Sequence, residues 1–432
     1  MTLRLLIWTL LLATTWAISP SANGQTVSGP NLYGAAVCEN PHRPPIRQVG
    51  YQLTHRMQGA RDSSCDEGCS KRSLHLTCGC PQCGPLRTWG RLEYVMGYTK
   101  GRNAPALASS GLNATNGILP AAEPLFGDKL GTGLGNGVRL DMGAWTAINS
   151  MAGMGLRFLY FGANMDELDV TSDGSTTLLA HPFFNPNLAA NDARPIAGTL
   201  GGETAAGSIS ITSNTDIVSF EPYLRAELIR GQGFHLDLLG GYHFTRISDK
   251  ISLQSQTSEL TGGFINGIDT TRSLSDHFDA SNHFHGASLG MMAEFRRKCW
   301  VLSIMGKISI GENSQRININ GLTDFDVSPD ALVGTYAGST NSGHYEDSQV
   351  AYIPEVEFTF RKEIRENLSV SLGYSLMYWS DVLLAGDSMD ATVNPNNFQA
   401  AGVQFPPLNP AFNFQPTDFW LQAVNVGIEW RY

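Results

Sequence analysis

The sequence lacks the long apolar runs of a helical membrane protein. A membrane-crossing helix takes about 20 consecutive apolar residues, and no such run follows the first 24 of the 432 residues. Positive charge is also scarce, since 29 Lys and Arg stand against 39 Asp and Glu, a net charge of −10. Without a basic patch, an acidic chain of this kind is not a nucleic-acid binder.

Cysteine is nearly absent from most of the chain. Six of the seven cysteines fall within residues 25–87, which we interpret as a Cys-rich periplasmic N-terminal segment. In an oxidising compartment they predict up to three disulfides, with 15 pairings open. The candidates are Cys38, Cys65, Cys69, Cys78, Cys80 and Cys83. A zinc site is the alternative for Cys80 and Cys83, although no second pair has matching spacing. Cys299 is expected either to stay free or to cross-link to this segment.

Residues 1–24 have the features of a secretory signal peptide. Arg4 supplies the positive charge, residues 5–13 are apolar, and Ala22-Asn23-Gly24 is a small-residue cleavage site. We therefore expect export with cleavage before Gln25. Loss of Arg4 takes the net charge of the mature chain from −10 to −11.

The clearest pattern present is strict alternation in Asp418–Tyr432. Trp420, Val424, Val426 and Ile428 share one parity, and Asn425, Glu429 and Arg431 share the other. Because side chains alternate across a strand, this ribbon has one apolar face and one charged face. Its length suits a strand that crosses a bilayer, which takes roughly 9–11 residues. The charged face then requires a closed barrel with a polar interior.

Ten such strands are expected. They are Trp89–Tyr98, Val138–Ala147, Gly153–Ala163, Val218–Arg230, Gly233–Ile247, Asn282–Arg296, Trp300–Ile310, Val350–Lys362, Asn367–Ser380 and Asp418–Tyr432. The connections contain 39, 5, 54, 2, 34, 3, 39, 4 and 37 residues. This alternation is typical of outer-membrane barrels, with short periplasmic turns and long extracellular loops. We predict that residues 88–432 form an all-β fold, a transmembrane antiparallel up-and-down β-barrel of about ten strands.

Three segments inside the long connections also alternate, but weakly. They are Ser208–Thr212, Ile251–Gln254 and Arg316–Asn320. They could extend strands beyond the membrane or add a hairpin, so a count of twelve strands stays open.

Aromatic residues of the lipid-facing parity gather near both ends of the strands. Phe295, Trp300, Phe358, Phe360 and Trp430 lie near the short turns, and Tyr98, Phe220, Tyr242, Tyr352 and Tyr378 lie near the long connections. Two aromatic belts suit the two membrane interfaces. We therefore expect localisation in the cell outer membrane, with outer-membrane lipids as the partner of this surface.

The opposite parity collects charge of both signs. Its members are Arg91, Glu93, Arg139, Asp141, Glu221, Arg225, Glu227, Glu355, Glu357, Arg361, Glu429 and Arg431, together with Arg157, Asp237, Glu294, Arg296 and Lys307. Barrels of about eight strands are filled by side chains, whereas aqueous channels take 16–18 strands. At ten strands we predict a paired charge network in the lumen rather than a wide pore.

An ordered set of motifs resembles a known family. The motifs are Leu125-Phe126-Gly127, Gly137 to Trp145 with Arg139, Ala193-Arg194-Pro195, Gly240-Gly241-Tyr242, Asp276-His277-Phe278 with Asn282 to Gly286, Pro354-Glu355, Gly386 to Asp390 with Val393-Asn394, and Phe419-Trp420 with Gly427-Ile428-Glu429. Together they resemble a planctomycete family of predicted outer-membrane β-barrel proteins of unknown function. The resemblance covers Trp89 to Tyr432. It implies a barrel and supplies no catalytic residues.

The best enzymatic candidate is the cluster Asp276, His277, Asp279, His283 and His285, expected at the extracellular mouth. Paired Asp and His could activate a water there, as in ten-stranded outer-membrane proteases, or hold a divalent metal. The simpler interpretation is a polar loop entering a strand. We expect no enzyme, no cofactor and no metal site. The preferred function is a structural, surface-exposed barrel with a filled lumen. The alternatives are a narrow porin-like channel for small solutes and then an outer-membrane hydrolase, and the sequence identifies no extracellular partner.

Overall fold

The computed structural model describes residues 87–146, 151–265, 267–398 and 404–432. These residues form fifteen β-strands and three short 3-10 helices. Among them, no helix is long and apolar enough to cross a membrane. The predicted signal peptide and all six clustered cysteines lie outside the described residues, so both predictions stay open. Cys299 lies between β11 and β12 and is disulfide-bonded, so the alternative of a free thiol is wrong. Which cysteine it pairs with stays a prediction that non-reducing peptide mapping decides.

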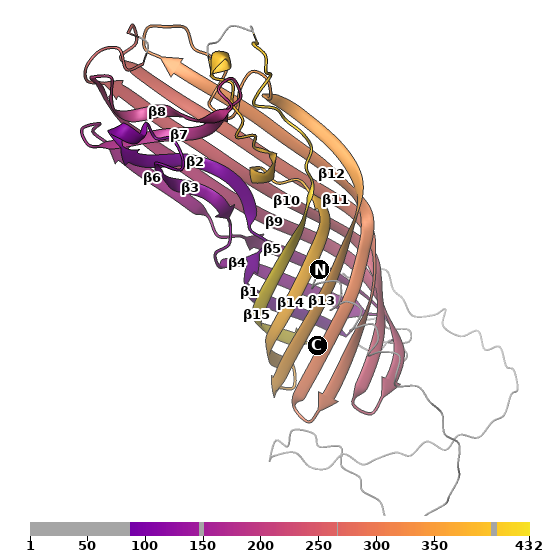
Figure 1. Cartoon of the computed structure of the whole chain (residues 1–432). Coiled ribbons are helices and arrows are strands. Elements are labelled where there is room, and N and C mark those ends of the chain that lie inside the picture. Colours follow the sequence, from indigo (N-terminus) through magenta and orange to yellow (C-terminus); the bar gives the residue numbers. More distant parts are fainter. Residues whose placement is uncertain (1–86, 147–150, 266, 399–403) are drawn as a thin grey trace, which may run out of the picture. The chain divides into compact units, whose positions relative to one another are not determined.

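Ten of the described strands close into a ring (Figure 1). They are β1 (Thr88–Thr99), β4 (Gly135–Trp145), β5 (Ala152–Gly162), β9 (Glu203–Gly231), β10 (Phe234–Glu259), β11 (Thr271–Arg297), β12 (Trp300–Phe325), β13 (Gly343–Arg365), β14 (Leu368–Val382) and β15 (Thr417–Arg431). Each pairs antiparallel with its two neighbours, and β15 closes on β1 from Trp89↔Arg431 to Thr99↔Leu421. Closure leaves the ring no free edge. The predicted ten-stranded barrel is therefore confirmed, and the count of twelve is wrong for the ring.

The ring is apolar on its outside. Along β15, Val424, Val426 and Ile428 are exposed by 43, 43 and 46 %, whereas Ala423 and Asn425, which have the opposite parity, are buried. Such exposure of large apolar side chains suits contact with lipid rather than with water. The turns β4–β5, β9–β10, β11–β12 and β13–β14 all lie at one end of the ring, which we call the short-turn end. By the rule for outer-membrane barrels this end faces the periplasm.

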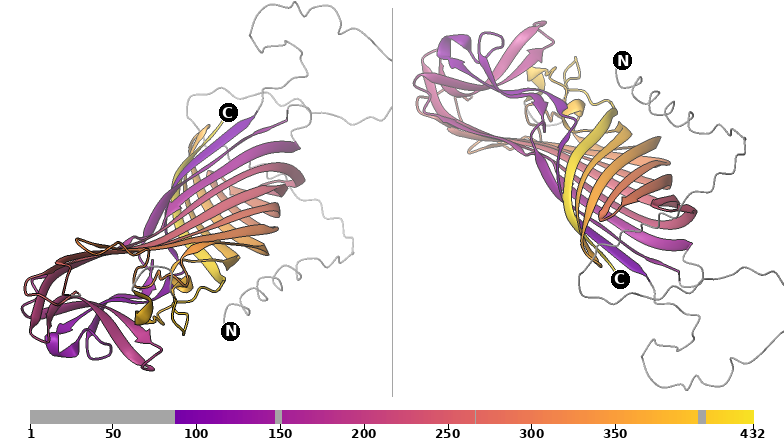
Figure 2. Two further views of the ribbon diagram at one scale, coloured as in Figure 1. Left: turned by 90° about the horizontal axis from the view of Figure 1, so that it is seen from above. Right: turned by 90° about the horizontal axis from the view of Figure 1, so that it is seen from below.

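The long connections are largely folded, which corrects the expectation of loops. They contain β2 (Arg102–Leu112), β3 (Glu123–Leu130), β6 (Asp166–Ser172), β7 (Thr177–Asn185) and β8 (Ala190–Leu200). Beyond the ring, β9 continues and pairs with β6 and β8, while β10–β13 continue beside it (Figures 1 and 2). We call these five strands, the continuing parts of β9–β13 and the β14–β15 connection the head.

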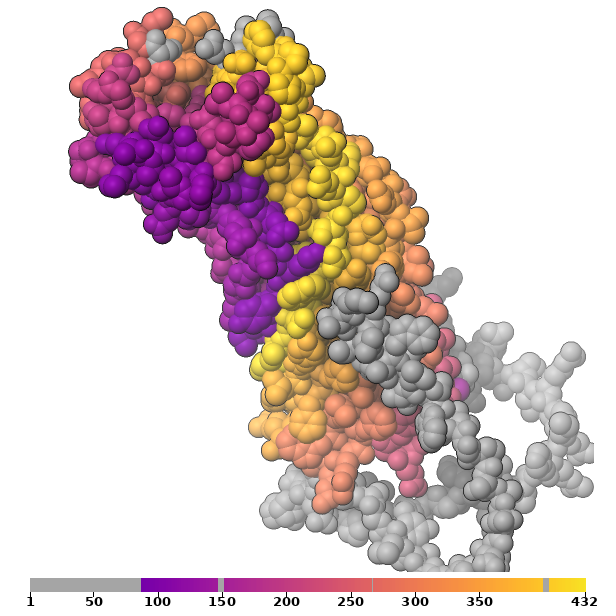
Figure 3. Space-filling view, viewed as in Figure 1, coloured from indigo at the N-terminus to yellow at the C-terminus, as the bar shows by residue number. Residues whose placement is uncertain are grey.

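The head has a hydrophobic core of its own. Twenty-three buried residues form it. They come from the continuing parts of β9–β12, from a second layer made of β2, β3, β7 and β8, and from the β12–β13 and β14–β15 connections. Full burial of one Leu, Ile or Phe side chain contributes roughly 1.5–3 kcal/mol. The three weakly alternating segments each supply two of them: Ile209 and Ile211, Ile251 and Leu253, and Ile317 and Ile319. The weak alternation is therefore that of strands that continue beyond the ring, and their apolar side chains are buried against the layer of β2, β3, β7 and β8. On the head's surface, the indigo β2–β3 region and the yellow β14–β15 connection lie side by side (Figure 3).

Candidate functional site: the barrel interior

The predicted charge network lies inside the ring. Eight of its twelve principal members are buried, namely Arg91, Glu93, Arg139, Asp141, Glu221, Glu357, Arg361 and Glu429. The other four are half-buried, namely Arg225, Glu227, Glu355 and Arg431. Strict alternation along each strand produces this placement, because the charged parity points inward wherever the other parity faces lipid.

One group of ion pairs is centred on Glu357. Its carboxylate contacts Arg91 Nη2 at 2.8 Å and Arg139 Nη1 at 3.2 Å. Both guanidinium groups also approach Glu93, at 3.7 and 3.6 Å. Glu93 makes no direct hydrogen bond to a described residue, so these two arginines are what offset its burial. Removing one partner of such a group is costly because a buried charge then stays unpaired.

Two further groups connect other strands of the ring. Arg361 contacts Glu429 and also Glu294, the latter at 2.7 Å. Arg431 Nε contacts Glu429 at 2.6 Å. In the second group, Lys307 contacts Glu221 and also Glu355, the latter at 3.0 Å. Each group joins strands that are not neighbours in the ring, so the interior at this level is filled by paired side chains.

Above the charged layers, toward the head, the interior becomes apolar. We call this cluster the stopper: Val95, Leu159, Phe161, Ala163, Ile217, Ile247, Phe284, Ala351, Ile353, Met377, Trp379, Val382, Leu384, Phe419, Leu421 and Ala423. Its largest side chains are at most 1 % exposed. Phe284 and Trp379 pack edge to face, with ring centroids 5.9 Å apart. Eight of the ten ring strands contribute to the stopper.

The start of the β14–β15 connection seals the stopper from above. The side-chain amide of Asn282 both donates to Leu383 O and accepts from Leu383 N, each at 2.8 Å. Asn313 and Gln315 donate to Asp381 O at 2.7 and 2.6 Å. These bonds satisfy the carbonyl oxygens of Asp381 and Leu383 and the N–H group of Leu383, which would otherwise need water.

Sequence reasoning missed the stopper. Along β5 the inward Leu159 and Phe161 alternate with the outward Phe158 and Tyr160, so both parities are apolar. A continuous apolar run at the head end of several strands was the available signal. Such a run indicates a strand that is apolar on both faces. Here one face contacts lipid, and the other face packs into the apolar cluster inside the ring.

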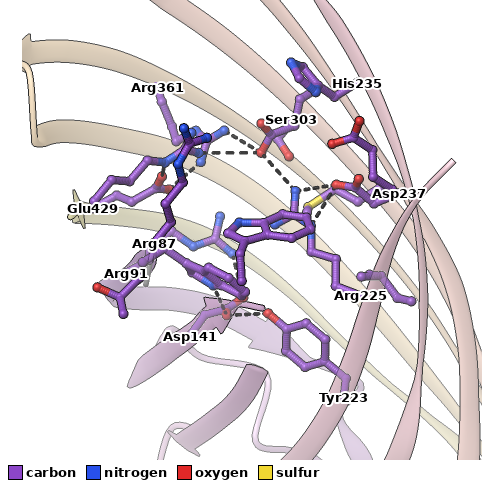
Figure 4. A pocket seen from close by; sticks show the side chains of 18 of the residues that line it. Arg87, Arg91, Asp141, Tyr223, Arg225, His235, Asp237, Ser303, Arg361 and Glu429 are labelled. Atoms are coloured by element: carbon purple, nitrogen blue, oxygen red, sulfur yellow. Dashed lines mark hydrogen bonds and ion pairs between the residues drawn. The ribbon is translucent and has the colours of Figure 1, made fainter. Parts of the chain in front are cut away.

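A cavity of about 310 Å³ lies at the short-turn end of the ring (Figure 4). We call it the vestibule. Trp89, Trp145 and Arg431 line it close to the turns, and Asp141, Arg157 and Tyr223 line it deeper in the ring. Tyr223 donates to Asp141 at 2.8 Å, and Arg157 contacts the other carboxylate oxygen at 3.2 Å.

The candidate hydrolytic cluster that we set aside in favour of a polar loop is not assembled. Asp276 is buried in the head core, where it accepts hydrogen bonds from the backbone N–H groups of Thr335 and Ala337 at 3.0 and 2.8 Å. Burial raises the pKa of Asp276, and these two N–H groups oppose the shift. His277 and Asp279 point to the other side of β11, where they contact Ser252 and Lys250. Alternation along one strand thus separates the residues that the mechanism would need together.

His283 and His285 also lie outside the barrel wall. Both pack against Phe244, with ring centroids 6.4 and 5.0 Å away. The outward parity predicted for them is therefore correct. Among the described residues, no group of three or more His, Cys, Asp or Glu could hold a metal ion.

Solved structures and one family model are similar to this chain. The outer membrane protease OmpT from Escherichia coli is similar at 10 % identity and a TM-score of 0.36, over 80 % of this chain and 96 % of that one. The Pseudomonas putida toluene transporter TodX is similar at 9 % identity and a TM-score of 0.19, over 81 % and 91 %. Neither likeness says anything about activity here, and no curated protein matches the sequence. The family model described as "Putative beta barrel porin-7 (BBP7)" matches residues 89–432. The chain belongs to this family of outer-membrane β-barrels.

Proposed function

We propose that this protein is a closed outer-membrane barrel that holds its folded head at the cell surface and conducts no solute. The observation that carries the proposal is the stopper, an apolar cross-section inside a ring of only ten described strands. Apolar constrictions exclude water and ions, since a polar group transferred there without a hydrogen bond costs roughly 2–7 kcal/mol.

The head supports a surface role rather than a channel role. It continues the strands of the ring and has its own hydrophobic core. Loops that only border a channel mouth need no such core. We infer that the barrel anchors the head and that contacts with molecules outside the cell are made by the head.

Single-channel recording tests the proposal. Full-length wild-type protein, refolded into a planar lipid bilayer, should give no unitary conductance. Asn282→Ala removes both hydrogen bonds to Leu383, so we expect brief openings in this variant. The matched control is Asn320→Ala, an exposed position on β12, which should remain silent. A steady conductance of the wild-type protein would reject the closed barrel.

A narrow channel is the second candidate, and one observation favours it. The charged interior and the vestibule extend from the short-turn end well into the ring, as a solute path would. This function requires the stopper and residues 381–385 to move. A disulfide engineered across the stopper separates the two candidates, because it should abolish any wild-type conductance if the stopper is a gate.

A further inference from the structure

The vestibule has an unusual balance of charge. Eight Arg side chains and five Asp or Glu side chains line it, an excess of three guanidinium groups over these carboxylates. Arg91 and Arg296 also contact carboxylates beyond the wall, Glu357 at 2.8 Å and Glu363 at 2.7 Å. The stronger imbalance is in hydrogen-bonding capacity, because each guanidinium has five N–H donors.

The carboxylates of the wall are already engaged. Both oxygens of Glu227 accept from Arg230, and the two oxygens of Glu429 are taken by Arg361 and Arg431. Asp237 contacts Arg225 through a hydrogen bond of 2.7 Å from Nε. The carboxylate oxygens of the wall therefore already accept hydrogen bonds from arginines. The arginines have more N–H groups than these carboxylates can accept.

Two observations show arginine donors that the protein does not use fully. Arg157 Nε is buried without a hydrogen-bond partner among the described residues. Arg225 lies against two indole rings, 5.0 Å from the centroid of Trp145 and 5.7 Å from that of Trp89. Stacking on aromatic faces holds a guanidinium in place and leaves N–H groups at its edge for another acceptor.

We propose that the vestibule is a binding site for a small oxyanion, a phosphate or carboxylate group presented from the periplasmic side. A planar guanidinium fork matches both groups with paired hydrogen bonds. The volume of about 310 Å³ is at the lower end of the roughly 300–1,000 Å³ range of ligand sites. A cation would meet carboxylates that already contact arginines, and a neutral molecule would leave the surplus donors unpaired.

Titration of the mature full-length protein with inorganic pyrophosphate and with citrate tests the site. Trp89 and Trp145 line the vestibule, so calorimetry can be combined with tryptophan fluorescence. We expect saturable binding of at least one probe that weakens as sodium chloride is added, because salt screens such interactions. Binding of only one probe identifies the preferred oxyanion. Methyl glucoside, a neutral probe of similar size, should not bind.

Two substitutions at one ion pair should act in opposite directions. Arg230→Gln removes a donor and leaves Glu227 to repel the probe, so affinity should fall about tenfold, the value of one charged hydrogen bond. Glu227→Gln removes a negative charge and frees Arg230, so affinity should rise. The control Arg316→Gln changes an exposed ion pair with Glu346 in the head and should have no effect. The proposal fails if neither probe binds at low salt, or if the Arg230 and Glu227 variants bind like the wild type.

Discussion

His181 is a fully buried residue of the head, and its ionisation would place a charge in the head core. Its Nδ1–H donates to Leu107 O at 2.6 Å, and its Nε2 lies 3.1 Å from Ser255 Oγ. Burial lowers the pKa of His181 to about 4, and the nearby charges of Arg194 and Arg272 act in the same direction. A head core that needs a neutral imidazole must lose stability in acid.

We predict acid sensitivity of the head through this side chain. The pKa of His181 is about 4 in the folded state and 6.5 in the reference state. The unfolded chain therefore binds the proton first, so stability is complete above about pH 6.5 and falls as the pH drops toward 4. The loss approaches about 3 kcal/mol at pH 4. Thermal unfolding across this range should show it, and His181→Gln should flatten the slope by about one proton. An unchanged slope in the variant would contradict the assignment.

A second prediction at this scale concerns Arg361, which joins Glu294 and Glu429 inside the ring. Arg361→Ala leaves buried carboxylate charge without its partner and should cost about 3–5 kcal/mol of unfolding free energy. The matched control is Arg296→Ala, because Arg296 and Glu363 form a partly exposed pair worth about 0–1 kcal/mol. Denaturant titration in lipid vesicles measures both. Equal losses in the two variants would mean that the interior network does not stabilise the barrel.

At the scale of strands, the sequence predicted the strands that face lipid on one side, and it missed the strands and the apolar cluster that are covered by other parts of the protein. A strand between lipid and a charged lumen alternates apolar with polar or charged side chains, so all ten ring strands could be placed from the sequence. In the head, Ile251 and Leu253 are buried against another layer rather than lipid, and their polar neighbours resemble those of a loop. The charge network followed from parity alone. The stopper did not, because Phe161 and the outward Tyr160 differ only in what covers them.

Hydrogen exchange tests the extended strands. Residues 248–258 of β10 pair with β9 on one side and β11 on the other, so their amide groups should be as protected as those within the membrane. Residues 260–265 lie beyond β10, and their amide hydrogen bonds, such as Leu260 N to Thr204 O and Gly263 N to Glu259, belong to a turn rather than to a ladder between two strands. They should therefore exchange faster than residues 248–258. Mass spectrometry of peptides from both ranges gives the comparison. Rapid exchange throughout residues 248–265 would show that the extensions are not stable strands.

At the scale of the molecule, one antiparallel sheet serves two environments. The same five strands, β9–β13, line the charged interior at one end and the head core at the other. Because the strands are continuous, the head cannot move independently of the barrel wall without breaking ladder hydrogen bonds. Its orientation relative to the membrane is therefore fixed by the barrel.

The last prediction is the direction of that orientation. Leu188, in the β7–β8 turn of the head, is 67 % exposed, and Gln232 lies in the two-residue β9–β10 turn at the short-turn end. If short turns face the periplasm, a protease-sensitive epitope inserted at Leu188 should be cut on intact cells. The same epitope at Gln232 should be cut only after the outer membrane is breached. Both insertions lie in exposed turns, so each serves as the folding control for the other. Cleavage of the Gln232 epitope on intact cells, with the Leu188 epitope protected, would place the head in the periplasm and overturn its surface role.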